Sequence, residues 1–243
     1  MTFTLGIIGG GRAAWAFGST WRRIGWPLAG VALRSESAIP RLLDAPMRTR
    51  DELTNDAELI LIAVSDRAIE HVAASIPQTQ AILFHPSGIL TSVRGGFSLH
   101  PLKSLPPVGE PSDLGGSLLV FEGAHREVAE RIASAAGARF AEIAPEQKVL
   151  YHAAAVFGSN YVAALLDIAE ELIGIEHARE DLAALAESAI SNWRRHSDSR
   201  RFTGPAARGE REVIERHLEA LQADPQLAEL YRVLAARILA TGK

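Results

Sequence analysis

The sequence contains no cysteine, and this absence removes several kinds of chemistry at once. Disulfide bonds, thiolate nucleophiles and cysteine-ligated metal sites are all excluded. A chain without thiols is compatible with a reducing compartment, and its first residues lack the basic start of a signal peptide. We therefore expect a cytoplasmic protein.

The sequence also lacks a strong excess of charge of either sign. It has 25 basic and 29 acidic residues, for a formal net charge of −4, so no general attraction to nucleic acid or to an anionic membrane is expected. No apolar run approaches the roughly 20 residues that cross a bilayer. We therefore expect neither a nucleic acid nor a membrane as a partner.

The histidines lack the spacing of a zinc site. There are eight of them, and neither H-x-x-x-H nor H-E-x-x-H occurs, so we expect no metal site. What the sequence does have is apolar residues. They make up 47% of its 243 residues, enough for a sizeable core in one large domain or two small ones.

Segments of strand and helix character alternate through the first half of the chain. Alternation of this kind is typical of a parallel sheet covered by helices on both faces. The sequence therefore predicts an α/β fold with a doubly wound, Rossmann-type parallel sheet. The clearest strands are expected at 3–8, 28–33, 58–64 and 81–84, and the clearest helices at 12–24 and 66–75.

The pattern changes near residue 145, because no strand can be identified from Pro145 onward. We predict a dinucleotide-binding domain over 1–145 and an all-helical domain over 146–243 for substrate binding and dimerisation. A loop rich in proline and glycine, 103–116, precedes the join. The expected helices of the second domain lie at 146–173, 177–196, 208–222 and 225–240.

The second domain has more apolar surface than its own folding requires. Segments 146–173 and 225–240 both have broad apolar faces. Contiguous apolar surface on a soluble domain marks an interaction site. We therefore predict a homodimer formed through the second domain.

The most specific motif is Gly9-Gly10-Gly11-Arg12-Ala13-Ala14, which fits G-x-G-x-x-A directly after the first predicted strand. Gly9 permits a tight turn, Gly11 lets the backbone approach a pyrophosphate, and Ala14 lets the helix pack closely on the strand. The helix start adds free N–H groups and a partial positive charge. This setting favours dinucleotide binding over a glycine turn without a ligand.

The end of the second predicted strand distinguishes NAD from NADP. An acidic residue there accepts hydrogen bonds from a ribose hydroxyl, whereas an arginine favours a 2′-phosphate. The sequence has Arg34 followed by Ser35, which can add a hydroxyl donor. NADP is therefore preferred over NAD, with Glu36 as a ribose partner the alternative.

Ligands of a doubly wound sheet bind beyond the carboxyl ends of its strands. Val64 and Ser65 follow one predicted strand, and Ser87 follows the next. These residues are expected to line the ribose and the nicotinamide. For Ser87 two roles are open: a bond to the carboxamide or substrate, or a turn.

Several segments together resemble one family, the Rossmann-like proteins with a carboxyl-terminal helical domain of unknown function. This family is related to pyrroline-5-carboxylate reductase, β-hydroxyacid dehydrogenases and deazaflavin-dependent NADP oxidoreductases. The matching segments are Gly6-Ile7-Ile8-Gly9-Gly10-Gly11-Arg12, Ala63-Val64-Ser65-Asp66-Arg67-Ala68-Ile69, His85-Pro86-Ser87-Gly88, His100-Pro101-Leu102, Tyr151-His152-Ala153-Ala154-Ala155, Ser159-Asn160-Tyr161 and Phe202-Thr203-Gly204-Pro205-Ala206-Ala207-Arg208-Gly209.

The resemblance implies a hydride-transfer fold and a helical domain, similar to that of 6-phosphogluconate dehydrogenase, that often pairs subunits. It implies no particular substrate. The sequence departs from the family pattern at Pro86, where a small or polar residue is more common. It departs again at Lys103-Ser104, where a glutamine-threonine pair is usual.

Hydride transfer to a C=O or C=N bond needs a group that neutralises the charge developing on the heteroatom, a role that suits histidine. His100 follows a strand-like stretch, and His152 opens the first helix of the second domain. Asn160 is two turns after His152, so the two roughly share a helix face. The related β-hydroxyacid dehydrogenases have a lysine one turn before this asparagine; here it is absent, leaving His152, with Lys103 as a fallback.

Three functions remain open at this point. The first is an NADP-dependent oxidoreductase that acts on a small carbonyl, imine or hydroxy-acid substrate in an interdomain cleft. The second is a non-catalytic NADP-binding sensor or assembly protein. The third is hydride exchange between NADP and a deazaflavin coenzyme. A basic cluster around 194–201 is interpreted either as an anion-binding site or as a solvated loop.

Overall fold

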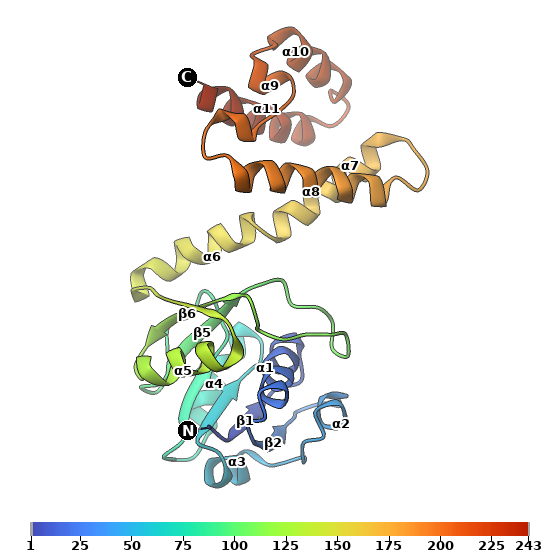
Figure 1. The fold of residues 1–243 in the computed structure, drawn as a ribbon. Coiled ribbons are helices and arrows are strands. Elements are labelled where there is room, and N and C mark those ends of the chain that lie inside the picture. Colours follow the sequence, from blue (N-terminus) through green and yellow to red (C-terminus); the bar gives the residue numbers. More distant parts are fainter. Residues whose placement is uncertain (1, 243) are drawn as a thin grey trace. The chain divides into compact units, whose positions relative to one another are not determined.

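A seven-stranded sheet forms the first part of the chain (Figure 1). The computed structural model describes residues 2–242. The strand order is β2-β1-β3-β4-β5-β6-β7. The strands are β1 (Leu5–Ile8), β2 (Leu28–Ala32), β3 (Leu59–Ile62), β4 (Ile82–His85), β5 (Phe97–Leu102), β6 (Leu118–Gly123) and β7 (Arg139–Glu142).

The predicted doubly wound parallel sheet is confirmed, with one exception. Strands β5 and β6 pair antiparallel, while every other described pair of neighbours is parallel. A parallel return needs a long crossover, usually a helix. The predicted loop after β5 contains no helix, so the chain comes back beside β5 in the opposite direction.

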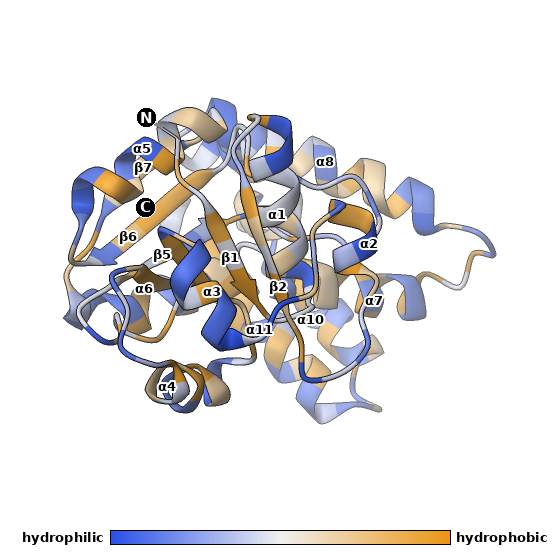
Figure 2. Cartoon of the chain, turned by 90° about the horizontal axis from the view of Figure 1, so that it is seen from below, coloured by the Kyte–Doolittle hydropathy of each residue, from blue (hydrophilic) through white to orange (hydrophobic). Residues whose placement is uncertain are grey.

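Alternate side chains of strands β1 to β4 enter different cores on the two faces of the sheet. Ile7 of β1 packs with Phe17 and Trp21 of α1, whereas the next residue, Ile8, packs with Ile69 of α4. β1 and β3 therefore contain only apolar residues and glycine, as Figure 2 shows for β1. Helices α1 (Arg12–Arg23), α2 (Ile39–Leu43) and α5 (Arg126–Ala136) contribute to one core, and α3 (Arg50–Asp56) and α4 (Asp66–Ser75) to the other.

From Pro145 onward the described residues form helices and their connections. The chain divides into two compact units, one ending at Asn160 and the other beginning at Tyr161. The first helix of this region therefore belongs to the unit that contains the sheet. The helices are α6 (Lys148–Phe157), α7 (Asn160–Ile173), α8 (Arg179–Arg195), α9 (Pro205–Arg208), α10 (Arg211–Ala220) and α11 (Pro225–Leu239), with single 3₁₀ turns at Pro145–Gln147, Ser199–Arg201 and Ala240–Gly242.

The single helix predicted over 146–173 is wrong in one respect, because the chain is interrupted between α6 and α7. Gly158 is the C-cap of α6, and the Ser159 hydroxyl donates to the Ala155 carbonyl at 2.7 Å. Glycine weakens a helix, and a serine that bonds back to the preceding turn competes with the helix ladder. Helix α6 therefore ends at Phe157, and α7 begins at Asn160.

The expectation about apolar segments also needs correction. The stretch Pro145–Ile173, 29 residues long, reaches a mean hydropathy of 1.4 in its most apolar window and is long enough to cross a membrane by length and composition alone. That window is 0% buried inside the chain. The stretch contains no uninterrupted apolar run of this length, because polar residues such as Ser159, Asn160 and Asp167 divide it.

The glycine turn gives the first testable prediction. Gly9 has a φ of +126°, and a Cβ at this position would lie 2.2 Å from the Ala63 carbonyl oxygen. At Gly11 an added Cβ would meet nothing within 4 Å. We expect Gly9→Ala to lower the free energy of unfolding by about 2 kcal/mol or more, through strain and overlap.

Urea unfolding monitored by circular dichroism measures this cost. Gly11→Ala is the matched control, since it adds the same methyl group in the same turn and is expected to change stability by less than about 1 kcal/mol. Equal stability of the two variants would contradict the close approach of Gly9 to the strand end.

Candidate active site

The glycine turn lies where the order of the strands reverses. β1 has β2 on one side and β3 on the other, so the chain winds away from β1 in both directions. Such a switch point opens a crevice at the carboxyl ends of the strands. Gly11 is the N-cap of α1 and is exposed together with Arg12, while Ala13 is half-buried and Ala14 is fully buried in the core. The start of α1 thus presents backbone N–H groups to an anion.

Two neighbouring segments touch this turn. The Ser37 hydroxyl, in the loop after β2, donates to the Gly10 carbonyl at 3.1 Å. The same loop carries Arg34 and Ser35, whose side chains are exposed. An arginine after the second strand of this fold favours a 2′-phosphate. The structure therefore brings the predicted phosphate-binding residues to the side of the glycine turn.

The end of β3 forms the other side of the turn. Gly9 approaches the backbone of Ala63 and Val64 so closely that no side chain fits between them. Ser65 is exposed and is the N-cap of α4, as its sequence position predicted. Val64 and Ser65 thus lie at the crevice edge expected to contact a bound dinucleotide.

A buried histidine, His85, forms two hydrogen bonds with the backbone of the loop after β4. His85 Nδ1 accepts the Ser87 N–H at 3.3 Å, and Nε2 donates to the Thr91 carbonyl at 2.9 Å. This pattern requires a neutral imidazole, and burial lowers the pKa of His85 accordingly. The Ser87 hydroxyl accepts the N–H groups of Ile89 and Leu90. In this structure Ser87 therefore acts as a turn residue.

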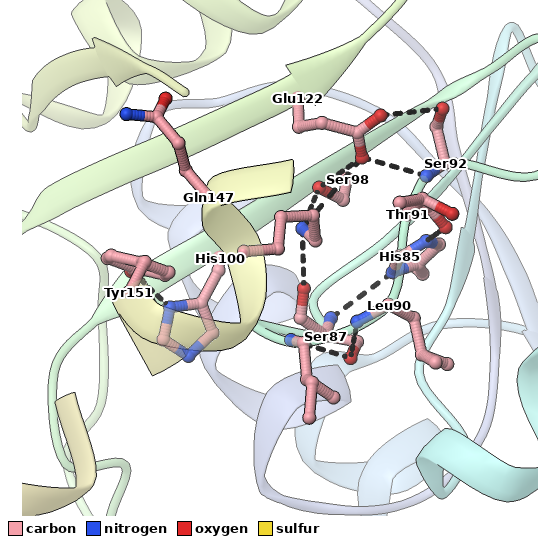
Figure 3. Close-up of polar contacts among 12 residues, drawn as sticks. His85, Ser87, Leu90, Thr91, Ser92, Ser98, His100, Glu122, Gln147 and Tyr151 are labelled. Atoms are coloured by element: carbon pink, nitrogen blue, oxygen red, sulfur yellow. Dashed lines mark hydrogen bonds and ion pairs between the residues drawn. The ribbon is translucent and has the colours of Figure 1, made fainter. Parts of the chain in front are cut away.

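His100, Tyr151 and His152 meet beside this loop. Strand β5 continues past the end of β4, because His85 is opposite Ser98, and His100 therefore lies beyond the last residue of β4. Its Nδ1 is 2.5 Å from the Tyr151 hydroxyl, and a dashed line in Figure 3 marks this hydrogen bond. The rings of His100 and His152 have centroids 6.0 Å apart. A Cβ on Gly88 would lie 2.6 Å from His152 and 3.1 Å from His100 Nε2.

Burial sets the protonation of this group. Burial, with smaller contributions from His152 and Lys148, lowers the pKa of His100 to about 4. Burial also raises the pKa of Tyr151 to about 12. At neutral pH the two side chains are therefore both uncharged, and one hydrogen bond joins them.

Lys148, the first residue of α6, has its ammonium group inside the protein. The side chain is 2% exposed, and Nζ donates to Ser98 Oγ at 2.6 Å and to the Ser87 carbonyl at 3.4 Å. Burial lowers the pKa of Lys148 to about 8, against the opposing effect of Glu122 and Asp66. The amine is thus mostly charged at neutral pH and ties α6 to β5 and to the loop after β4.

Glu122 of β6 is the counter-charge of Lys148. Its side chain is 4% exposed, and Oε2 lies 3.9 Å from Lys148 Nζ. The carboxylate accepts the N–H and the hydroxyl of Ser92 and the hydroxyl of Ser98. Ser98 therefore accepts from the lysine and donates to the glutamate, and the buried pair is connected through hydrogen bonds (Figure 3).

Other predicted residues lie away from this group. Asn160 is exposed at the start of α7, beyond the helix interruption. The Lys103 amine donates to the Asp113 carbonyl at 2.7 Å and so serves the loop that follows β5. In the basic cluster, Arg200 is paired with Asp198 and Arg201 donates to the carbonyl of Ser197. Among residues 2–242 no cluster of three potential metal ligands is present.

Sequence reasoning missed Lys148, Glu122 and the role of Tyr151. Tyr151 was part of a motif, but its side chain was not considered as a partner of His100. Glu122 offered a signal, since it is an isolated charge in an otherwise apolar strand. A charge at such a position is rarely buried without a partner, which predicts a buried cation somewhere in the chain.

The comparisons with known proteins fit this geometry. A model described as a Rossmann-like domain matches residues 1–109, and a model described as a domain of unknown function (DUF2520) matches residues 119–238. The chain belongs to the Rossmann-like proteins with a carboxyl-terminal DUF2520 domain. Among curated proteins no match is found. The two matching models confirm the resemblance noted from the sequence.

Solved structures share the fold along nearly the whole chain. A presumptive NADP oxidoreductase from Bacteroides fragilis has a TM-score of 0.83 at 22% identity, with 98% of each chain covered. A reductive aminase from Aspergillus terreus, in complex with NADPH and ethyl-5-oxohexanoate, has a TM-score of 0.65 at 18% identity, covering 100% of this chain and 95% of the other. Pyrroline carboxylate reductase from Plasmodium falciparum, with NADP bound, has a TM-score of 0.64 at 12% identity. The match covers 99% of this chain and 98% of the other.

The buried ion pair gives a prediction about stability. Lys148→Met leaves the Glu122 carboxylate buried without its counter-charge, and we expect it to lower the free energy of unfolding by about 3 to 5 kcal/mol. The double variant Lys148→Met with Glu122→Gln removes both charges and should recover part of this loss. Urea unfolding of the three proteins measures the difference.

An exposed ion pair provides the control. Arg126 bonds Glu130 at 2.9 Å, and both side chains are about half exposed. Glu130→Gln should cost less than about 1 kcal/mol. If Lys148→Met cost no more than this control, the ammonium group would not be a structural tie.

Proposed function

We propose that the chain is an NADP-dependent oxidoreductase that acts on a small carbonyl, imine or hydroxy-acid substrate next to His100, Tyr151 and His152. The observation that carries the proposal is the shared location of two features at the carboxyl ends of the strands. One is the exposed glycine turn at the switch point, and the other is the group of polar rings against Gly88. A hydride donor and a proton donor are needed together.

The neighbouring structures support the cofactor assignment. The reductase from P. falciparum has NADP bound, and the aminase from A. terreus has NADPH bound. In this chain Arg34 and Ser35 supply a charge and a hydroxyl in the loop that touches the glycine turn. That donor set suits a 2′-phosphate better than an unmodified ribose, because it contributes a full positive charge.

A non-catalytic NADP-binding sensor is the second candidate. It is favoured by the neutral state of His100 and by the raised pKa of Tyr151, since neither group is a strong acid at neutral pH. A third candidate, hydride exchange with a deazaflavin, makes smaller demands on a protein acid. All three functions require the same cofactor site. They differ in whether a hydride is transferred and in which compound receives it.

The cofactor assignment predicts a selective loss in one variant. Arg34→Asp should weaken NADPH binding about 10- to 100-fold, because it removes one charge-assisted bond and adds a like charge near the phosphate. NADH binding should change much less. Nicotinamide fluorescence titration measures both dissociation constants. Equal losses for NADPH and NADH would contradict the assignment of Arg34, and Gly11→Ala should weaken both coenzymes alike.

The same protein then separates the three functions. NADPH oxidation is followed with a panel of aldehydes and ketones, keto acids, cyclic imines and a deazaflavin. Turnover of a carbonyl or an imine supports the oxidoreductase, and turnover of the deazaflavin alone supports hydride exchange. Tight NADPH binding without turnover of any compound would favour the sensor.

We further propose that the protein is a homodimer through its helical region. Large apolar side chains are exposed on α7, α8 and α11, among them Leu172, Leu185, Trp193 and Val233, each more than half exposed. Monomeric soluble proteins rarely leave such surfaces uncovered. A second copy carries the same surface and can cover it symmetrically, as most homo-oligomers do.

Light scattering at micromolar concentration tests the dimer. We expect twice the chain mass for the wild type and a shift toward the single-chain mass for the variant Leu172→Glu with Val233→Glu. Met47→Glu is the control, because Met47 is 56% exposed and lies in the unit that contains the sheet. A monomeric wild type would contradict the proposal.

A further inference from the structure

Tyr151 and His100 form a closely bonded pair. The hydroxyl oxygen lies 2.5 Å from Nδ1, and the rings meet edge to face with their centroids 5.5 Å apart (Figure 3). Tyr151 is on the first turns of α6 and His100 is in β5, so the contact joins two elements held in place by Lys148. The distance and orientation between Tyr151 and His100 are therefore set by the contact of α6 with β5.

The other nitrogen of His100 faces the loop after β4. A Cβ on Gly88 would lie 3.1 Å from His100 Nε2, so only the hydrogen atoms of glycine separate this nitrogen from the backbone. The loop lies at the carboxyl end of β4, the side of the sheet on which ligands bind in this fold. Nε2 thus lies against a loop at the ligand-binding edge of the sheet, whereas Nδ1 is occupied by the Tyr151 hydroxyl.

One hydrogen bond joins the pair, so one of its two members must donate. The ionisable groups around His100 are Tyr151, His152 and Lys148. The buried Lys148 ammonium and the low polarity of the site disfavour an imidazolium. A neutral imidazole that accepts the phenol hydrogen at Nδ1 must have its own proton on Nε2.

We propose that Tyr151 and His100 form a proton relay, in which His100 Nε2 protonates the substrate oxygen while Tyr151 passes its proton to Nδ1. This inference rests on the proposed function. It deepens that function by choosing a neutral carbonyl group over an imine as the substrate class. A protonated imine already carries the proton that its product amine needs, so a relay is required only for C=O.

The step balances in atoms and electrons. A bound reduced nicotinamide would supply a hydride to the carbonyl carbon and would itself be oxidised, and the C=O π pair would move to oxygen. The oxygen takes the proton of Nε2, and Nδ1 takes the proton of Tyr151. The alcohol leaves, Nδ1 returns its proton to the tyrosinate, and Nε2 takes a proton from water, which restores the resting tautomer.

The acidities favour this direction. A tyrosine of pKa about 12 is a weak acid in water. It is still a stronger acid than an aliphatic alcohol, whose acidity is close to that of water. Proton transfer from Tyr151 to the newly formed alkoxide is therefore downhill, and no charged acid is needed in the resting site.

The first arm of the test needs no substrate. Long-range ¹H–¹⁵N spectra of the histidine side chains at pH 7 report the charge and the tautomer of His100. We expect a neutral ring with its proton on Nε2, and a mixture of tautomers in Tyr151→Phe. A charged ring, or a proton on Nδ1 in the wild type, would overturn the relay.

The second arm measures turnover. Tyr151→Phe should lower kcat for carbonyl reduction by about 100-fold or more while leaving the NADPH dissociation constant unchanged. Reduction of a preformed cyclic imine should change less than about threefold. The matched control is Tyr231→Phe, because Tyr231 bonds His217 Nδ1 at 2.6 Å in a similar edge-to-face pair between α10 and α11. This control should leave turnover unchanged.

The outcomes separate the relay from the proposed function. Wild-type protein that binds NADPH and reduces no compound would overturn the proposed function, and with it the relay. Protein that reduces carbonyls equally well with and without the Tyr151 hydroxyl would overturn the relay alone. A selective loss of carbonyl turnover together with the Nε2 tautomer would support both.

Discussion

The arrangement of the candidate site depends on the hydrogen bond from the Lys148 ammonium to Ser98. This bond fixes the first turn of α6 against β5, and the contact with the Ser87 carbonyl fixes the same turn against the loop after β4. Tyr151 and His152 follow three and four residues later on the same side of the helix. Their positions beside His100 therefore follow from where the lysine is held.

The same ammonium group shapes the electrostatics of the site. A buried positive charge disfavours a second one, so His100 stays neutral although it is a histidine near other polar groups. Glu122 balances the charge of Lys148 from the far side, through Ser98. The network thus supplies rigidity and a fixed charge distribution together, which an apolar contact would not do.

The sequence was sufficient for features that depend on local pattern. The glycine turn, Arg34 in the loop beside it and the strand containing His100 all follow from motifs with a known backbone setting. Lys148 and Glu122 could not be paired from the sequence, because their contact joins β6 to α6 and depends on the antiparallel return of β6. The interruption at Gly158 was missed for a different reason. Glycine and serine occur inside many helices, and the end of α6 at Gly158 is seen only in the structure.

Helix α6 has the opposite polarity to an ordinary surface helix, which turns its apolar side inward. Lys148, Tyr151 and His152 face the sheet or its loops, whereas Val149 is 64% exposed and Leu150 is 77% exposed. A helix that lines a polar site must turn its remaining apolar side elsewhere. The exposure of Val149 and Leu150 is thus a consequence of the site itself. A partner with an apolar surface would bury them without any change in the helix.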